Sequence, residues 1–190
     1  MRKLVFATNN PNKIQEVNSI LGDRFELLSL EDIQCFEDIP EDGDTLEENA
    51  RQKSDYVVEH FGLNCFADDS GLEVEALNNE PGVYSARYSG SRDMDRNIQL
   101  LLENLKDHSN KKARFRTVIS LHMDGANYLF EGIVEGVIID ELKGDGGFGY
   151  DPIFIPNGYD KTFAQMTPDE KNSISHRAIA VRKLVDFLGQ

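Results

Sequence analysis

Apolar and polar positions along the chain follow two different periods, and together they predict a mixed α/β protein. The apolar run at residues 4–7 gives way to a polar Thr-Asn-Asn-Pro segment, which is typical of a buried strand that enters a loop. Asn10 can cap a following helix and Pro11 suits its first position, while apolar residues at helical spacing continue to Gly22. Free backbone amides at such a helix start attract anions, so residues 8–13 form a candidate anion site.

An acidic loop at residues 37–44 precedes a second predicted helix. Residues 45–48 have the pattern of a capping box, in which Glu48 closes back onto the cap residue, and Gly62 marks the helix end. Residues 64–67 predict a short buried strand that ends at Asp68, and the alternation at 72–76 predicts a separate, half-exposed strand.

Further elements are predicted in the second half of the chain. Apolar spacing indicates a helix around residues 98–105, and two alternating runs, 113–123 and 128–139, predict an antiparallel hairpin. The remaining signals are a glycine-rich loop (144–149), a short strand (153–155), a capping box (167–170) and a final helix that Ser175 can cap. No repeat or low-complexity linker interrupts this pattern, so we expect one domain, residues 1–190, with one apolar core.

The charge of the chain narrows the classes of partner. The 190 residues include 34 Asp and Glu against 20 Lys and Arg, a formal net charge of −14. Binders of nucleic-acid polymers or anionic membranes present basic surfaces, so neither partner is expected, although a local cluster of cations can still bind one phosphate-bearing molecule. No apolar stretch approaches the roughly 18–20 residues of a membrane span, and the first apolar run is too short for a secretory signal. We therefore expect a cytoplasmic protein, in which Cys35 and Cys65 are reduced, buried thiols.

Two adjacent acids, Asp68 and Asp69, follow the second apolar run. Two unit charges about 4 Å apart repel by roughly 4 kcal/mol at an effective dielectric of 20, so the pair needs a cation or several donors. One interpretation is an Asx-turn at the end of the strand; the other is a Mg²⁺ ligand beside a base that activates water. Phosphatases of the haloacid dehalogenase type require Asp-x-Asp, and this spacing excludes them.

A lysine in the first turn of the first predicted helix also suggests a ligand. Lys13 opposes the helix dipole there by roughly 0.3–1 kcal/mol, which is explained if an anion such as a triphosphate binds at the helix start. The segment is not a Walker loop, because no glycine precedes a Gly-Lys-Ser/Thr sequence at the required spacing.

The glycine-rich loop matches G-x-G-x-x-G, but a strand follows it where a dinucleotide fold has a helix. Phe148 and Asp151 suit a nucleobase pocket, as a ring that stacks and an acceptor for a base edge; the alternative places Phe148 in the core. Local sequence favours structural roles for His176, since no nucleophile accompanies it, and for Glu48.

Seven segments in this order resemble the pyrophosphatases of inosine and xanthosine triphosphates, the inosine triphosphate pyrophosphatase family. The segments are residues 8–13, 45–50 with Lys53, 67–72, 81–88, 146–152, Lys171 and 175–177. The resemblance implies Mg²⁺-dependent hydrolysis of ITP, dITP or XTP to the monophosphate and pyrophosphate. It also implies an elongated mixed sheet flanked by helices, two lobes with a central substrate cleft, and a homodimer.

The resemblance also assigns roles to individual residues. Asp69 is implied as the catalytic proton acceptor, and Glu41 and Asp69 as the metal ligands. The implied substrate-binding residues are Thr8, Asn9, Asn10, Pro11, Asn12, Lys13, Lys53, Ser70, Phe148, Gly149, Tyr150, Asp151, Lys171, His176 and Arg177. Phe148 to Asp151, Lys171, His176 and Arg177 are expected to form the base pocket. Asn9 departs from the family pattern, since many members have glycine there.

Two other functions remain open at this point. A Maf-like pyrophosphatase would act on other modified nucleotides, and a non-catalytic module would bind a nucleotide without releasing pyrophosphate. A site that selects a 6-keto purine needs a donor facing O6 and an acceptor facing N1–H, and adenine inverts both.

Overall fold

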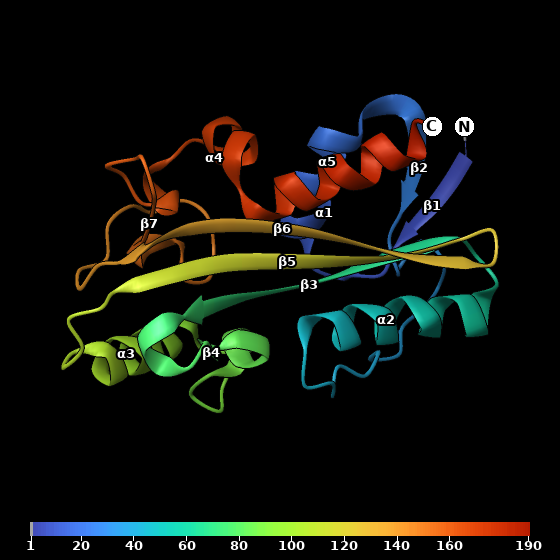
Figure 1. The fold of residues 1–190 in the computed structure, drawn as a ribbon. Helices are drawn as coiled ribbons and strands as arrows, with labels where there is room; N and C mark the ends of the chain where they lie inside the picture. The colour runs from blue at the N-terminus through green and yellow to red at the C-terminus, as the bar shows by residue number, and fades with distance from the viewer. Residues whose placement is uncertain (1) are drawn as a thin grey trace. The chain divides into compact units, whose positions relative to one another are not determined.

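The computed structural model describes residues 2–190 and shows a mixed α/β fold in which helices flank a single sheet (Figure 1). The strands are β1 (Arg2–Phe6), β2 (Phe25–Leu28), β3 (Cys65–Val74), β4 (Glu80–Pro81), β5 (Lys112–Met123), β6 (Ala126–Ile138) and β7 (Phe154–Pro156). The helices are α1 (Pro11–Leu21), α2 (Leu46–Phe61), α3 (Met94–Leu105), α4 (Pro168–Ile174) and α5 (His176–Leu188). The predicted mixed α/β sheet flanked by helices is confirmed.

The sheet combines parallel and antiparallel pairs. Its strand order is β2-β1-β3-β5-β6-β7, and β4 pairs with β3 outside this path. β1 runs parallel to both β2 and β3, whereas β6–β7 and β3–β4 are antiparallel. The predicted hairpin is formed by β5 and β6, whose two-residue connection, Asp124-Gly125, has positive φ at both positions.

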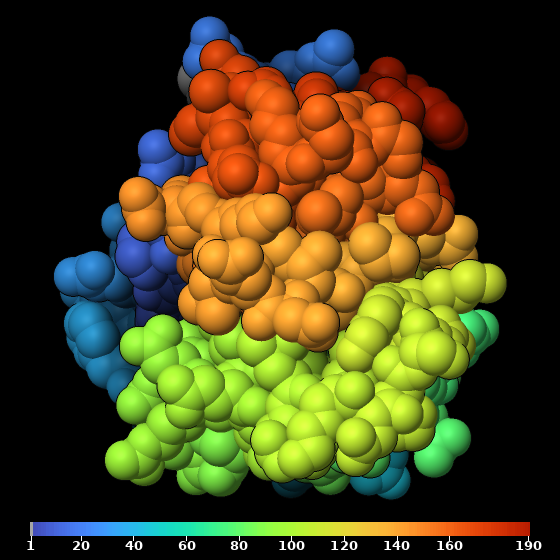
Figure 2. All heavy atoms as spheres, turned by 90° about the vertical axis from the view of Figure 1, so that its left-hand side faces the viewer, coloured from blue at the N-terminus to red at the C-terminus, as the bar shows by residue number. Residues whose placement is uncertain are grey.

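The chain forms two compact units. Unit 1 contains the residues up to Asp69, together with Thr117–Gly132 and Arg177–Gln190; unit 2 contains Ser70–Arg116 and Ile133–His176. Each unit has its own apolar clusters, so the expectation of one core is wrong. Figure 2 shows unit 2 segments that are distant in sequence, green to yellow and orange, packed into one face. That residues 1–190 act as one domain stays a prediction.

Unit 1 buries both faces of its short parallel strands. In β1, Leu4 and Phe6 pack with residues of α1 and α5, whereas the alternate residue Val5 packs with Val57 of α2. Figure 1 shows α1 and α5 on one face of these strands and α2 on the other. Burial of both faces explains why the run at residues 4–7 is continuously apolar.

The cap of α1 follows the sequence prediction closely. The Asn10 side chain accepts hydrogen bonds from the backbone amides of Asn12 and Lys13, Pro11 occupies the first turn, and Gly22 caps the end with a φ of 63°. Two amides that we expected to be free for an anion are therefore engaged by Asn10.

The segment around the paired acids differs from the prediction. β3 continues without a break from Cys65 to Val74, so neither the strand end at Asp68 nor the Asx-turn occurs. Because side chains alternate along a strand, Asp68 and Asp69 face opposite sides of the sheet. The separate strand expected at residues 72–76 is the second half of β3.

The two predicted capping boxes have different outcomes. Thr167 and Glu170 form the complete reciprocal box at α4. At α2, Thr45 accepts from the Glu48 amide as predicted, but the Glu48 carboxylate accepts from the backbone amide of Asp44 instead of closing onto Thr45. Glu48 therefore secures the end of the acidic loop.

The cysteine prediction is confirmed: Cys35 and Cys65 are free and buried. Across residues 2–190, the helices are all too short or too polar to span a membrane.

Helix α5 contributes buried residues to the apolar core of unit 1, so we expect it to be essential to stability. Leu184 is completely buried, and replacing it with alanine should lower the free energy of unfolding by about 2–5 kcal/mol because a cavity remains. Urea denaturation of Leu184→Ala measures this loss. Leu129→Ala is the matched control in the same unit, because Leu129 is 43% exposed. Equal losses for the two variants would contradict this account of the core.

Candidate active site

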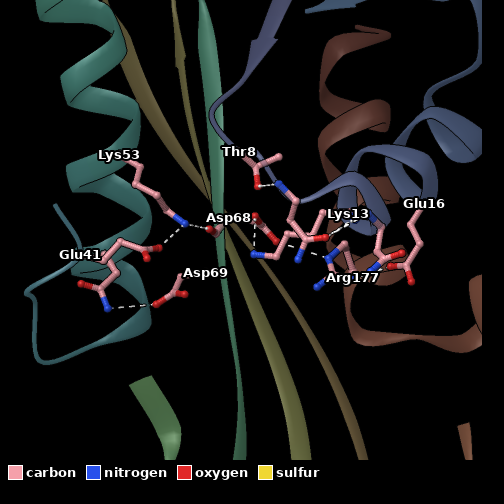
Figure 3. A network of polar contacts seen from close by, with 11 residues as sticks. Thr8, Lys13, Glu16, Glu41, Lys53, Asp68, Asp69 and Arg177 are labelled. Carbon is pink, nitrogen blue, oxygen red and sulfur yellow. Dashed lines mark hydrogen bonds and ion pairs between the residues drawn. The ribbon is translucent and has the colours of Figure 1, made fainter. Parts of the chain in front are cut away.

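The candidate site of unit 1 lies on both faces of β3 at the paired acids. Figure 3 shows Asp68 turned toward Lys13 and Arg177, and Asp69 on the side of α2, near Glu41. Asp68 is 1% exposed, whereas Asp69 is partly exposed. The two neighbouring acids therefore have different environments and can have different roles.

Asp68 is held by two cations from distant parts of the chain. Lys13 Nζ lies 3.1 Å from Oδ1, and Arg177 Nε lies 3.4 Å from Oδ2. Burial by itself would raise the pKa of Asp68, but the positive charges of Lys13, Arg177 and Lys53 outweigh it and keep the pKa well below its usual value. Asp68 is thus an ionised, buried counter-ion.

Arg177 and Lys13 carry this charge network to the start of α1. Arg177 is 2% exposed, and its guanidinium also donates to the Glu16 carboxylate. Burial lowers the pKa of Lys13, although Asp68 opposes the shift. In the adjoining loop, the backbone amide of Asn10 donates to Thr8 Oγ1 at 3.1 Å. The predicted anion-binding residues 8–13 thus adjoin a buried cluster of cations.

Lys53 connects α2 to both the acidic loop and β3. Its Nζ lies 2.6 Å from Glu41 Oε1 and also donates to the backbone carbonyl of Asp68. Burial lowers the pKa of Lys53, but Asp68 and Glu41 outweigh it, and the net pKa is raised. Burial raises the pKa of Glu41, and Lys53 overcomes this effect, so Glu41 stays ionised at neutral pH.

Asp69 has the opposite electrostatic balance from Asp68. Burial, with a contribution from Glu41, raises the pKa of Asp69 to about 6, against the opposing charges of Lys53 and Lys13. The side-chain amide of Asn49 donates to Asp69 Oδ2 at 3.1 Å. A carboxylate with a pKa near neutrality suits the acceptance of a proton from water.

The donor set fits Mg²⁺ of the kind that binds with a substrate. Glu41 and Asp69 are close enough to influence each other electrostatically, and their carboxylate oxygens are the hard ligands that Mg²⁺ prefers. Within residues 2–190, no group of three or more His, Cys, Asp or Glu side chains could hold a metal. Two carboxylates suffice for Mg²⁺ when substrate phosphates and water complete its coordination.

A second set of predicted residues gathers in unit 2. Lys171 Nζ lies 2.8 Å from Asp151 Oδ2, which also accepts from the Phe148 backbone amide at 3.0 Å. The same ammonium lies 4.4 Å from the centre of the Phe148 ring. Gly147 is required here, because a Cβ would lie 2.2 Å from Asp151 Oδ2. Phe148 is half-buried and lies outside the apolar cluster of unit 2, so its placement in the core is wrong.

Tyr150 and His176 make structural contacts in unit 2. The Tyr150 hydroxyl donates to the Ser85 carbonyl at 2.7 Å, and its side chain belongs to the apolar cluster. The His176 ring stacks on Phe115 with centroids 4.8 Å apart. Gly149 has a φ of 63°, and Ser70 lies next to Asp69 along β3.

The sequence profile of the Ham1 family matches residues 4–187. The chain belongs to the Ham1 family. Its relatives include two proteins named dITP/XTP pyrophosphatase. The one from Christiangramia forsetii is 56% identical over 99% of this chain and 100% of its own length, and the one from Bacillus subtilis is 45% identical over 99% and 98%.

Solved Ham1 structures have the same fold. The Staphylococcus aureus Ham1 protein superimposes with a TM-score of 0.92 at 40% identity, over 99% of this chain and 98% of that one. A HAM1 protein from Coxiella burnetii gives 0.93 at 38% identity, over 100% and 99%.

In this Ham1-family chain, the predicted residues fall into two sets. Residues 8–13, Glu41, Lys53, Asp69 and Arg177 belong to unit 1, and Ser70, residues 148–151, Lys171 and His176 belong to unit 2. The Arg177 guanidinium contacts Asp68 and Glu16. Its role toward a base stays a prediction.

Sequence reasoning missed the roles of Glu16 and Asn49. Glu16 is the second carboxylate on Arg177, and nothing in its local sequence indicates that contact. Asn49 had a usable signal: it lies four residues before Lys53, and so on the same face of α2.

Removal of the buried cation should destabilise the protein strongly. Arg177→Met leaves the buried Asp68 and the partly buried Glu16 without that partner, so the free energy of unfolding should fall by about 3–5 kcal/mol. Denaturant unfolding measures the loss. Arg182→Met, at an exposed position of the same helix, should change it by less than about 1 kcal/mol. A small effect of Arg177→Met would refute the proposed importance of the buried pairs.

Proposed function

We propose that this protein hydrolyses inosine and xanthosine triphosphates, including dITP and XTP, to the monophosphate and pyrophosphate. The observation that carries the proposal is the location of Asp69 and Glu41 within electrostatic reach of each other and of Lys53 and Lys13, in a Ham1-family fold. Full-length relatives named dITP/XTP pyrophosphatase support the choice of substrate.

The phosphate-binding part of the proposal rests on the cations of unit 1. Lys53 is buried and Lys13 is partly buried, and their ammonium groups already neutralise Glu41 and Asp68. Cations fixed in a site of low dielectric stabilise the charge that develops on phosphate oxygens during transfer. Residues 8–13 would bind the triphosphate, with Lys53 contributing from α2.

The reaction consumes one water per substrate. Asp69 orients this water and takes one of its protons, while the water oxygen attacks the α-phosphorus. The bond from the α-phosphorus to the bridging oxygen breaks, and pyrophosphate leaves with that oxygen. The raised pKa of Asp69 matches this role. Mg²⁺ held by Glu41 and Asp69 would neutralise developing negative charge when bound.

Recognition of the base would fall to unit 2. Phe148 offers a half-buried ring for stacking, and the Lys171 ammonium offers donors close to it. Asp151 fixes Lys171 and the Phe148 backbone in place. His176 would contribute to the same pocket. A donor directed at O6 accepts inosine and xanthosine and leaves buried groups unpaired with adenine, which disfavours ATP.

Three further parts of the proposal rest on the family resemblance: residues 1–190 act as one pyrophosphatase domain, the protein is a homodimer, and it works in the cytoplasm. The Ham1 profile spans nearly the whole chain, which supports the single domain.

A substrate panel tests the proposed reaction. With Mg²⁺, kcat/KM for dITP and XTP should exceed that for dATP by at least about 100-fold, because a hydrogen-bonded base site rejects the inverted donor pattern. Phosphorus NMR should detect pyrophosphate as the product, without orthophosphate. EDTA should stop the reaction, and added Mg²⁺ should restore it.

The same panel separates the alternatives. Preference for a modified pyrimidine would favour a Maf-like activity, and binding of dITP without pyrophosphate release would favour a non-catalytic module. Equal rates with dITP and dATP would refute the selectivity.

Replacement of the proposed proton acceptor should abolish turnover. Asp69→Asn keeps the shape of the side chain but cannot take the proton, so kcat should fall by about 10²–10⁴-fold. Circular dichroism and the melting temperature should stay close to those of the unmodified protein. Asp44→Asn, at an exposed position of the acidic loop, is the control and should leave kcat unchanged. A folded Asp69→Asn protein with full activity would remove Asp69 from this role.

A further inference from the structure

We propose that Asn49 is a positioning residue that sets the proton acceptor Asp69 against the loop that carries Glu41. The catalytic consequence rests on the proposed function, whereas the geometric role does not. One amide side chain contacts both Asp69 and Gly43, a backbone position two residues after Glu41 in the acidic loop.

The two ends of the Asn49 amide have different partners. The Gly43 backbone amide donates to Asn49 Oδ1 at 2.8 Å, and Asn49 Nδ2 donates to Asp69 Oδ2 at 3.1 Å. A backbone N–H can only donate and an ionised carboxylate can only accept, so the reversed amide would lose both bonds. Asn49 is 3% exposed, and water cannot easily replace either partner.

The surroundings hold this amide in place from both sides. Asn49 lies on the buried face of α2 with Ala50 and Lys53, so the helix fixes its backbone. Gly43 approaches so closely that a Cβ there would lie 2.9 Å from Asn49 Oδ1 and 2.6 Å from Glu48 Cβ. The loop can therefore reach the amide only because residue 43 is a glycine.

The two hydrogen bonds of Asn49 fix two geometric features that the proposed reaction needs. Glu41 lies two residues before Gly43, so the bond to Gly43 holds the loop that presents Glu41. The bond to Asp69 holds its carboxylate through Oδ2 and so fixes the orientation of the group. Asn49 thereby sets both the spacing of the two carboxylates and the orientation of the acceptor.

Two variants of Asn49 separate its functions. Asn49→Ala removes both bonds, whereas Asn49→Asp keeps an acceptor for Gly43 and loses the donor to Asp69. Gln52→Ala is the matched control: Gln52 Oε1 accepts from the Asp42 amide at 3.2 Å, and so anchors the same loop from the same helix.

The experiment measures Mn²⁺ binding to the protein by electron paramagnetic resonance in the presence of imidodiphosphate, whose phosphate oxygens complete the coordination. It also measures kcat, KM and the melting temperature. Asn49→Ala should weaken Mn²⁺ binding and lower kcat by about 10–100-fold each, with KM changed by less than about 3-fold. Asn49→Asp should lower kcat at least as much while retaining Mn²⁺ binding. Gln52→Ala should keep both within about 3-fold.

The outcomes are decisive even when a variant folds poorly. If Asn49→Ala does not fold, Asn49→Asp, which has nearly the same shape, decides the question. Full activity of Asn49→Asp, or losses in Gln52→Ala equal to those in Asn49→Ala, would overturn the positioning role, as would absence of Mn²⁺ binding to the unmodified protein. If the unmodified protein binds Mn²⁺ but releases no pyrophosphate, the proposed function fails and the Mn²⁺ comparison still tests Asn49.

Discussion

Burial of the Asp68 carboxylate is the constraint on which the arrangement of unit 1 depends. An unpaired charge in the interior costs several kcal/mol, so elements that carry cations must meet at this point of β3. Lys13 comes from the first turn of α1, and Arg177 from the first turn of α5. The same constraint gives the two acids different surroundings, because alternation along the strand turns Asp69 to the opposite face, where Lys53 and Glu41 lie.

Local features of the fold were predictable where the determining interactions are close in sequence. The Asn10 cap, the β5–β6 turn and the Thr167 capping box each depend on residues within a few positions of one another. The course of β3 was not predictable in this way. Two adjacent acids indicated a strand end, and the strand continues because cations 55 and 109 residues away compensate the buried one. A window of local sequence does not contain those partners.

The residues of the candidate site likewise divide into those that local sequence predicts and those that only long-range contacts define. Lys13 and Asp69 could be predicted from local sequence and Lys53 from the family resemblance. The proposed role of Asn49 depends on contacts to Gly43 and Asp69 that only the folded chain creates. Arg177 was grouped with its neighbour His176, yet consecutive residues of a helix point about 100° apart. His176 stacks on Phe115 in unit 2, while Arg177 reaches Asp68 in unit 1. The two neighbouring residues therefore have different contacts at this helix start.

The non-contiguous make-up of unit 1 has a consequence for the order in which it is assembled. Chains emerge from the ribosome from the N-terminus, and segments begin to fold as they appear. Lys13, Glu16 and Asp68 all belong to the first segment of the unit, but Arg177 is synthesised 109 residues after Asp68. Until then, the Asp68 carboxylate, which becomes buried, and the Glu16 carboxylate, which stays partly exposed, lack their shared guanidinium. The first segment, which supplies most of unit 1, therefore stays incompletely neutralised until α5 is synthesised.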